Sequence, residues 1–144
     1  MSLKKNLTFF TPSPEESEQF LFYQAGIKAG FPSPAIDFDE TRISLDRFLV
    51  KNTDATFYAK ASGTSMTGAG IDDGDIMVID RSLEPKDGKI AVCFIDGEFT
   101  VKRIKVAKEA VYLLPENKNF HPIKIGEENQ FFIWGIVTYV IKSM

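Results

Sequence analysis

The serine at position 65 is the candidate nucleophile of this sequence. It lies in Ala-Ser-Gly-Thr-Ser-Met-Thr-Gly, residues 61–68, directly after an apolar run that is typical of a strand. A phosphate-binding loop would need Gly-Lys before a Ser or Thr, and a nucleophile elbow would need Gly where the chain has Thr67. Glycine-flanked serines are common in turns. This segment by itself therefore favours a turn over chemistry.

A serine nucleophile also needs a group that accepts its proton. The only histidine, His121, precedes a proline in an expected turn, which favours a solvated position and disfavours a Ser-His-Asp triad. A lysine is the remaining side chain that can serve as the base. Lys102 is the best placed lysine.

Lys102 lies on the clearest hairpin of the chain. Asp96-Gly97, a dipeptide typical of two-residue hairpin turns, joins two strand-like runs, and Lys102 is on the second of them. Alternation puts Thr100, Lys102 and Ile104 on one face, and we expect little polarity around the lysine. A lysine pKa of about 10.4 must fall by roughly 3 units for base catalysis near neutrality, and burial is the expected cause. Spacing alone still favours a solvated strand face.

The elements that must position these residues are mostly strands. Short runs rich in β-branched and aromatic residues, bounded by Gly, Pro or Asp, predict strands over 56–60, 75–80, 89–95, 98–104, 111–114 and 131–141. A short helix is expected over 44–50. The prediction is a mostly β, small curled or barrel-like fold with one or two short helices.

The N-terminal part lacks the repeated strand-like runs of the rest of the chain and is expected to form an arm. Ser13-Pro14-Glu15-Glu16 matches a helix start, which predicts a helix over about 15–25. Phe22 and Gly26 blur its apolar stripe, so an extended arm is the alternative. Two prolines, at 32 and 34, favour an extended segment just after Gly30.

Composition limits the class of protein. The chain has 144 residues, close to one domain, with 44% hydrophobic and 26% charged residues, a net charge of -3 and a pI of about 5.2. This acidity disfavours direct, tight DNA binding. No apolar run is long enough to span a membrane and no secretory signal is evident, so we expect a cytoplasmic protein. One cysteine and one histidine cannot build a zinc site, and we expect no metal or cofactor.

Four motifs occur in one order along the chain. They are Ala-Gly-Phe-Pro-Ser-Pro-Ala at 29–35, Lys-Ala-Ser-Gly-Thr-Ser-Met at 60–66 followed by Asp-Gly-Asp at 73–75, Asp-Gly-Glu-Phe-Thr-Val-Lys-Arg at 96–103, and Trp-Gly-Ile-Val at 134–137. Together they resemble the UmuD branch of the LexA-like self-cleaving serine proteins over nearly the whole chain.

This resemblance implies a specific chemistry. Ser65 is the nucleophile, Lys102 the general base, and Ala29-Gly30 the bond that the chain cuts in itself, which divides it into an arm, 1–29, and a catalytic and dimerisation domain, 30–144. Candidate oxyanion donors are the backbone N–H groups of Gly63, Ser65 and Met66. The 35 positions from Gly30 to Ser65 span on the order of 100 Å if extended, which allows cleavage in cis or in trans.

The resemblance also implies partners. A RecA-type recombinase filament on single-stranded DNA stimulates the cut, and the homodimeric product joins a UmuC-like translesion DNA polymerase in the SOS response to DNA damage. The sliding clamp is a further candidate partner. Removing residues 1–29 takes away three lysines and three glutamates and leaves the net charge at -3, so the cut is expected to act by uncovering surface.

Three other interpretations compete with this one. A non-catalytic polymerase-binding module would use the same fold without the cut. A LexA-like repressor fragment would lack its DNA-binding domain, for which 29 residues are too few. A signal peptidase uses a similar Ser-Lys pair but needs a membrane anchor.

Overall fold

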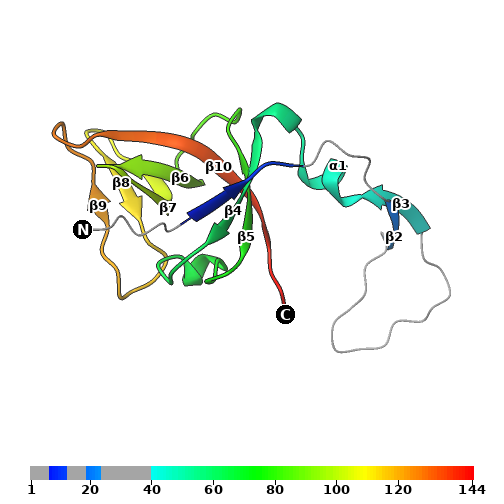
Figure 1. Cartoon of the computed structure of the whole chain (residues 1–144). Helices are drawn as coiled ribbons and strands as arrows, with labels where there is room; N and C mark the ends of the chain where they lie inside the picture. Colours follow the sequence, from blue (N-terminus) through cyan, green and yellow to red (C-terminus); the bar gives the residue numbers. More distant parts are fainter. Residues whose placement is uncertain (1–6, 13–18, 24–39) are drawn as a thin grey trace. The chain divides into compact units, whose positions relative to one another are not determined.

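The computed structural model describes residues 7–12, 19–23 and 40–144 (Figure 1). The contacts divide the chain into two units. One consists of Met1–Pro12 together with Asn52–Met144, and the other of Ser13–Lys51.

The larger unit is built on an eight-stranded antiparallel sheet, curled into an open half-barrel (Figure 1). Its spatial order is β1-β4-β5-β10-β6-β7-β8-β9. The strands are β1 (Leu7–Phe10), β4 (Thr56–Ala61), β5 (Ile76–Asp80), β6 (Ile90–Ile95), β7 (Glu98–Val106), β8 (Val111–Leu114), β9 (Ile123–Lys124) and β10 (Phe131–Ile141). The predicted mostly β fold and its six body strands are confirmed, with ends shifted by one or two residues.

Alternating side chains build an apolar cluster on each face of the sheet. Val92 and Val101 belong to the first cluster, with Leu7, Met66, Met77 and Ile79. Ala91, Cys93 and Ile104 belong to the second. The strand β10 runs between β5 and β6, so the two halves of the sheet share it. This period of two decides which side of β7 each residue faces.

The predicted hairpin is present between β6 and β7. Asp96 has φ 47° and Gly97 has φ 88°, two consecutive left-handed residues as a type I′ turn requires. The register pairs Ala91 with Lys102 and Cys93 with Thr100. The hairpin therefore carries Lys102 to the middle of the sheet.

The smaller unit contains β2 (Gln19–Tyr23), β3 (Glu40–Ser44) and α1 (Leu45–Leu49). The prediction of a short helix over 44–50 is confirmed: Ser44 is the N-cap of α1, and its hydroxyl accepts a hydrogen bond from the backbone N–H of Arg47.

The predicted helix over 15–25 is wrong where the structure describes it. Residues 19–23 form β2, which pairs antiparallel with β3. Its Phe-Leu-Phe-Tyr run has high β-propensity, and the pairing with β3 outweighs the capping signal. The remaining residues of that prediction, and the extended segment after Gly30, lie outside the described residues.

The strand β1 had no counterpart in the sequence analysis. It pairs with β4 from Leu7↔Ala61 to Phe10↔Tyr58 and forms one edge of the sheet. A segment of the expected arm thus contributes to the larger unit. The other unexpected parts are β3, β9 and two 3₁₀ turns, Thr53–Ala55 and Thr67–Ala69.

Within the described ranges, the chain has no helix of the length and apolar character that a membrane crossing requires.

Candidate active site

Ser65 lies in the loop that follows β4, and the loop 72–75 holds the end of that strand. The backbone N–H of Ala61 donates to the carbonyl oxygen of Asp75 at 2.7 Å, and that of Gly74 donates to the carbonyl oxygen of Ala61 at 2.8 Å. The Asp73 carboxylate accepts a bond of 2.8 Å from the N–H of Gly63. Gly63 itself has φ 95°, which favours glycine. The Asp-Gly-Asp motif therefore fixes the approach of the chain to Ser65.

A second segment, which follows β8, holds Ser65 from the other side. The N–H of Glu116 donates to the carbonyl oxygen of Ser65 at 2.8 Å, and the N–H of Gly68 donates to the carbonyl oxygen of Glu116 at 2.6 Å. The Asn117 side-chain amide donates to the carbonyl oxygen of Thr64 at 2.8 Å. A Cβ at position 68 would lie 2.5 Å from the Glu116 carbonyl oxygen, so this close approach needs glycine.

An ion pair ties this segment to the strand that carries Lys102. Arg103 Nε donates to a carboxylate oxygen of Glu116, and Arg103 Nη1 donates to the carbonyl oxygen of Gly88 at 2.6 Å. Arg103 and Lys102 are neighbours on β7 and point to opposite faces. The segment after β8 thus contacts both the Ser65 loop and β7.

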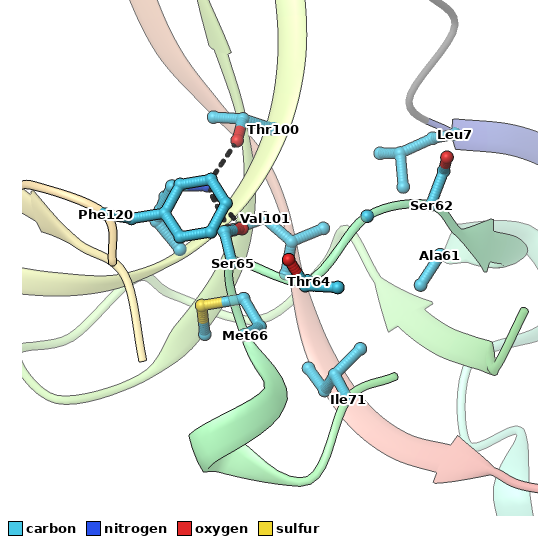
Figure 2. Close-up of a pocket in the computed structure, with 12 residues that line it drawn as sticks. Leu7, Ala61, Ser62, Thr64, Ser65, Met66, Ile71, Thr100, Val101 and Phe120 are labelled. Carbon is cyan, nitrogen blue, oxygen red and sulfur yellow. Dashed lines mark hydrogen bonds between the residues drawn. The ribbon is translucent and has the colours of Figure 1, made fainter. Parts of the chain in front are cut away.

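The side chain of Lys102 is buried, and its amine contacts Ser65 and two other oxygen atoms. Its Nζ lies 3.0 Å from Ser65 Oγ, 2.7 Å from Thr100 Oγ1 and 3.0 Å from the carbonyl oxygen of Val101 (Figure 2). The residue is only 7% exposed. The expected burial is present, but the expectation of little polarity around Lys102 is wrong. The amine bends back towards the side chain and carbonyl oxygen of its own strand, which alternation alone does not reveal.

Burial determines the protonation of this amine. It lowers the pKa of Lys102 below the usual 10.5, because the charged form loses its hydration. Among the described residues, no carboxylate forms an ion pair with Lys102 that would oppose this effect. Cys93, on β6, is the titratable group that influences it, and burial raises the pKa of that thiol to about 12. Near neutral pH, the thiol is therefore uncharged.

The contacts of Nζ match those of a neutral amine. A neutral amine has two N–H donors and one lone pair. Thr100 Oγ1 and the Val101 carbonyl oxygen can accept the two N–H bonds, and the Ser65 hydroxyl can donate to the lone pair. In this arrangement, the Ser65 hydroxyl proton points at the lone pair of the Lys102 nitrogen.

The pair opens into a pocket of about 210 Å³. Figure 2 shows the side chains that line it, which come from β1, the Ser65 loop, β7 and the segment after β8. Leu7, Met66, Ile71 and Phe120 give the pocket apolar walls. Such a pocket suits a small or apolar side chain beside the serine.

The remaining site predictions have different outcomes. Ala29 and Gly30 lie outside the described residues, so the cleavage site stays a prediction. His121 is exposed in a loop. The N–H of Gly63 is already bonded to Asp73. Within the described part of the chain, the N–H groups of Ser65 and Met66 donate to no protein acceptor.

Sequence reasoning missed Leu7, Thr100, Glu116 and Asn117. Thr100 could have been found, because it shares a strand face with Lys102 two residues away. The other three approach Ser65 only through long-range contacts, for which the sequence carries no local signal.

The comparisons with known proteins agree with the family motifs. The Peptidase S24-like family model matches residues 21–138. Protein ImpA of Salmonella typhimurium is 40% identical over 134 residues, which cover 90% of this chain and 88% of that protein. Protein MucA of Escherichia coli is 41% identical over 119 residues, or 82% and 81% of the two chains. Protein SamA of Salmonella typhimurium strain LT2 is 42% identical over 115 residues, or 80% and 79%. The chain therefore belongs to the Peptidase S24-like family of serine peptidases, as a UmuD-like member.

Proposed function

We propose that this protein is a self-cleaving serine peptidase in which Ser65 and Lys102 cut the Ala29-Gly30 bond. The observation that supports this most is the 3.0 Å approach of Lys102 Nζ to Ser65 Oγ at a position where burial lowers the lysine pKa. Among the described residues, this buried lysine has no carboxylate partner, which is unusual for a purely structural lysine and matches the needs of a general base.

The reaction has two stages. Neutral Lys102 accepts the Ser65 proton while Oγ attacks the Ala29 carbonyl carbon, and the protonated amine then delivers this proton to the leaving nitrogen of Gly30. The product of this stage is an ester between Ala29 and Ser65. Lys102 next takes a proton from a water molecule, which attacks the ester carbonyl carbon. The protonated amine then returns this proton to Ser65 Oγ as the bond between Oγ and the Ala29 acyl carbon breaks, which releases the Ala29 carboxyl group and restores Ser65 and neutral Lys102.

The oxyanion of each tetrahedral intermediate needs hydrogen-bond donors. The backbone N–H groups of Ser65 and Met66 are the proposed donors, because the N–H of Gly63 already bonds to Asp73. Thr100 is proposed as a positioning residue: its hydroxyl, 2.7 Å from Nζ, orients the amine towards Ser65.

The cut would act as a switch in SOS mutagenesis. Relatives ImpA, MucA and SamA share most of the chain length with this protein. By analogy with UmuD-like proteins, we propose that a RecA-type filament on single-stranded DNA stimulates the cut in the cytoplasm. The product, 30–144, would form a homodimer that serves a UmuC-like translesion polymerase, with the sliding clamp as a further partner.

Incubation of the purified full chain tests the chemistry. At pH 10, where more of Lys102 is neutral than at pH 7, the chain should cut itself without a partner, and N-terminal sequencing of the larger product should read Gly30-Phe31-Pro32. At neutral pH, a recombinase filament on single-stranded DNA should accelerate the same cut.

The matched control is Ser65→Ala, which removes only the hydroxyl. It should stay intact under both conditions. Cutting of Ser65→Ala at the rate of the unmodified chain, or an unmodified chain that stays uncut at pH 10 and with the filament, would contradict the proposal. A mixture of intact Ser65→Ala with active protein separates cleavage in cis from cleavage in trans.

A further inference from the structure

The edge of the sheet next to Ser65 is covered by β1, a short strand from the N-terminal region. Its four residues pair with β4 from Leu7↔Ala61 to Phe10↔Tyr58. Among the strands that the structure describes, β1 is the first in the sheet order and pairs with β4 alone. Without β1, the strand β4 would present an unpaired edge that ends four residues before Ser65. Such an edge is a template for another extended segment.

Alternate residues of β1 anchor it on one face. Leu7 is buried and belongs to the apolar cluster that contains Met66 and Val101, whereas Thr8 is exposed. The ring of Phe9 lies 4.7 Å from that of Trp134 and 5.3 Å from that of Phe99, measured between centroids. The anchor is therefore a pair, an aliphatic residue and an aromatic residue two positions later.

The anchor site is also part of the catalytic pocket. Leu7 lines the pocket together with Ser65 and Lys102. The aromatic site continues along the same side of the sheet, because the ring of Trp134 also contacts that of Phe57 of β4 in a tilted arrangement, with centroids 5.1 Å apart. Departure of β1 would thus uncover an apolar groove that runs along β4 up to the pocket.

We propose that this groove, formed by the edge of β4 with Phe99 and Trp134, is a strand-binding site whose ligand is the Leu7-Thr8-Phe9 segment of this chain. The proposal rests on the proposed cut at Ala29-Gly30 for its role, because residues 7–10 belong to the part that would be removed. In the uncut chain, the covalent link to β4 makes the binding of β1 intramolecular and keeps it at a high local concentration. After the cut, the fragment is held by the four residue pairs and two anchors of β1 and by the five residue pairs between β2 and β3.

The cut therefore turns β1 from a tethered strand into a dissociable ligand. The two pairings that this fragment makes, β1 with β4 and β2 with β3, are each only four or five residues long, and strand pairings this short are marginal in water without a link. Dilution of the product then frees the groove, and this is the surface that cleavage makes available. The balanced charge of residues 1–29 agrees with this, since their loss leaves the net charge unchanged.

A peptide-binding experiment tests the groove without any cleavage. All proteins are the full chain with Ser65→Ala. Phe9→Asp is added to expel β1, and Thr8→Asp, on the exposed side, is the matched control. The probe is a fluorescently labelled synthetic peptide of residues 1–12, followed by anisotropy. Trp134, the only tryptophan in the chain, reports the groove through its own emission.

The peptide should bind the Phe9→Asp chain at least tenfold more tightly than the Thr8→Asp chain, in which β1 occupies the groove. A peptide that carries Phe9→Ala should bind at least tenfold more weakly than the natural one. Equal binding to both chains, or equal binding of both peptides, would overturn the proposal. Circular dichroism checks folding, and the milder Phe9→Ala chain replaces Phe9→Asp if that chain unfolds. If Phe9→Ala also unfolds and the peptide does not restore the fold, β1 is a fixed structural strand and the proposal is wrong.

A second experiment, on protein that has cut itself, tests whether cleavage lets β1 leave the groove. In gel filtration, fragment 1–29 should travel with 30–144 at high concentration and separate from it on dilution. A fragment that stays bound at every dilution would overturn this inference alone. A chain that never cuts but still binds the peptide would overturn the proposed function alone.

Discussion

Two lysines of this protein, Lys102 and Lys142, have opposite electrostatic environments. Lys142 follows β10 and is partly exposed. It donates to Asp72 at 2.7 Å and to Asp75, and these hydrogen bonds raise the pKa of its amine. Lys102 is buried between β7 and the Ser65 loop, its acceptors are uncharged, and burial lowers its pKa. The environment of Lys142 thus favours the charged amine, whereas that of Lys102 favours the neutral amine.

The difference shows that the partners of a lysine decide its chemistry. Both amines have several oxygen acceptors, but only those of Lys142 include carboxylates, which favour the charged form. The two lysines contact neighbouring loops, because Lys142 pairs with Asp75, whose backbone holds the end of β4, while Lys102 contacts Ser65 in the loop that follows β4. Lys142 is therefore a structural cation, and Lys102, which lies in the same unit of the fold, is the candidate base.

The largest expected effect is the loss of self-cleavage in Lys102→Arg, and Lys142→Arg is the matched control. Lys102→Arg keeps a cation but cannot act as a base, because the guanidinium pKa exceeds about 12. We expect self-cleavage at pH 10 to fall by roughly 10³-fold or more, as measured by gel densitometry. Lys142→Arg can still pair with Asp72 and Asp75, so its rate should stay within about threefold. Similar losses in both variants would remove the distinction between the two lysines.

A carboxylate placed beside Lys102 should make its environment resemble that of Lys142. In Thr100→Asp, a negative charge replaces the hydroxyl that lies 2.7 Å from Nζ. An adjacent opposite charge shifts a pKa by about 1–3 units, which for a lysine is upward. Cleavage below the lysine pKa should therefore slow by roughly 10- to 1000-fold. Thr100→Ser, which keeps the hydroxyl, is the control and should remain close to the unmodified rate. An unchanged rate in Thr100→Asp would argue against Lys102 as the base.

The pH dependence of cleavage should report Lys102 alone. Since the neutral amine is the active form, the rate should rise about tenfold per pH unit and level off above the lowered pKa of Lys102. Cys93 should not interfere at lower pH, because the pKa of its thiol is raised to about 12. Lys142→Arg should leave the profile unmoved, whereas Thr100→Asp should move it to higher pH. A rate that falls as the pH rises from 7 to 10 would contradict Lys102 as the base.

Loss of the ion pair between Lys142 and Asp75 should mainly lower the thermal stability of the protein. Asp75 is buried, and its hydrogen bonds with Lys142 and with the N–H of Asp72 lower its pKa below the usual 3.8. A lowered folded pKa means that its stabilisation is complete above the unfolded value and is lost as the pH falls through the folded value. Asp75→Asn should lower the thermal midpoint at pH 7 by roughly 5 °C, with a smaller difference below pH 3. A difference that does not depend on pH would show that the Asp75 charge is not responsible.

Local patterns were enough to predict most of the sheet. The Asp96-Gly97 turn and the alternation around it placed β6 and β7 correctly, because hairpins are encoded by neighbouring residues. The same alternation placed Thr100 on the face of Lys102. Local signals failed in the N-terminal region, where the capping pattern before Gln19 predicted a helix and the structure has β2. The pairing of β2 with β3, twenty residues away, overrides that signal.

The sequence by itself determined which residues could do chemistry and on which elements they lie: Ser65 after a strand, Lys102 on a hairpin strand. Only the tertiary structure decided that they meet, because Ser65 and Lys102 are 37 positions apart and their contact depends on the curl of the sheet and on Glu116 and Asp73 holding the loop. It also decided that Lys102 is buried without a carboxylate while Lys142 has two. A pKa depends on everything that surrounds a group in space, and a linear sequence specifies that environment only through the fold.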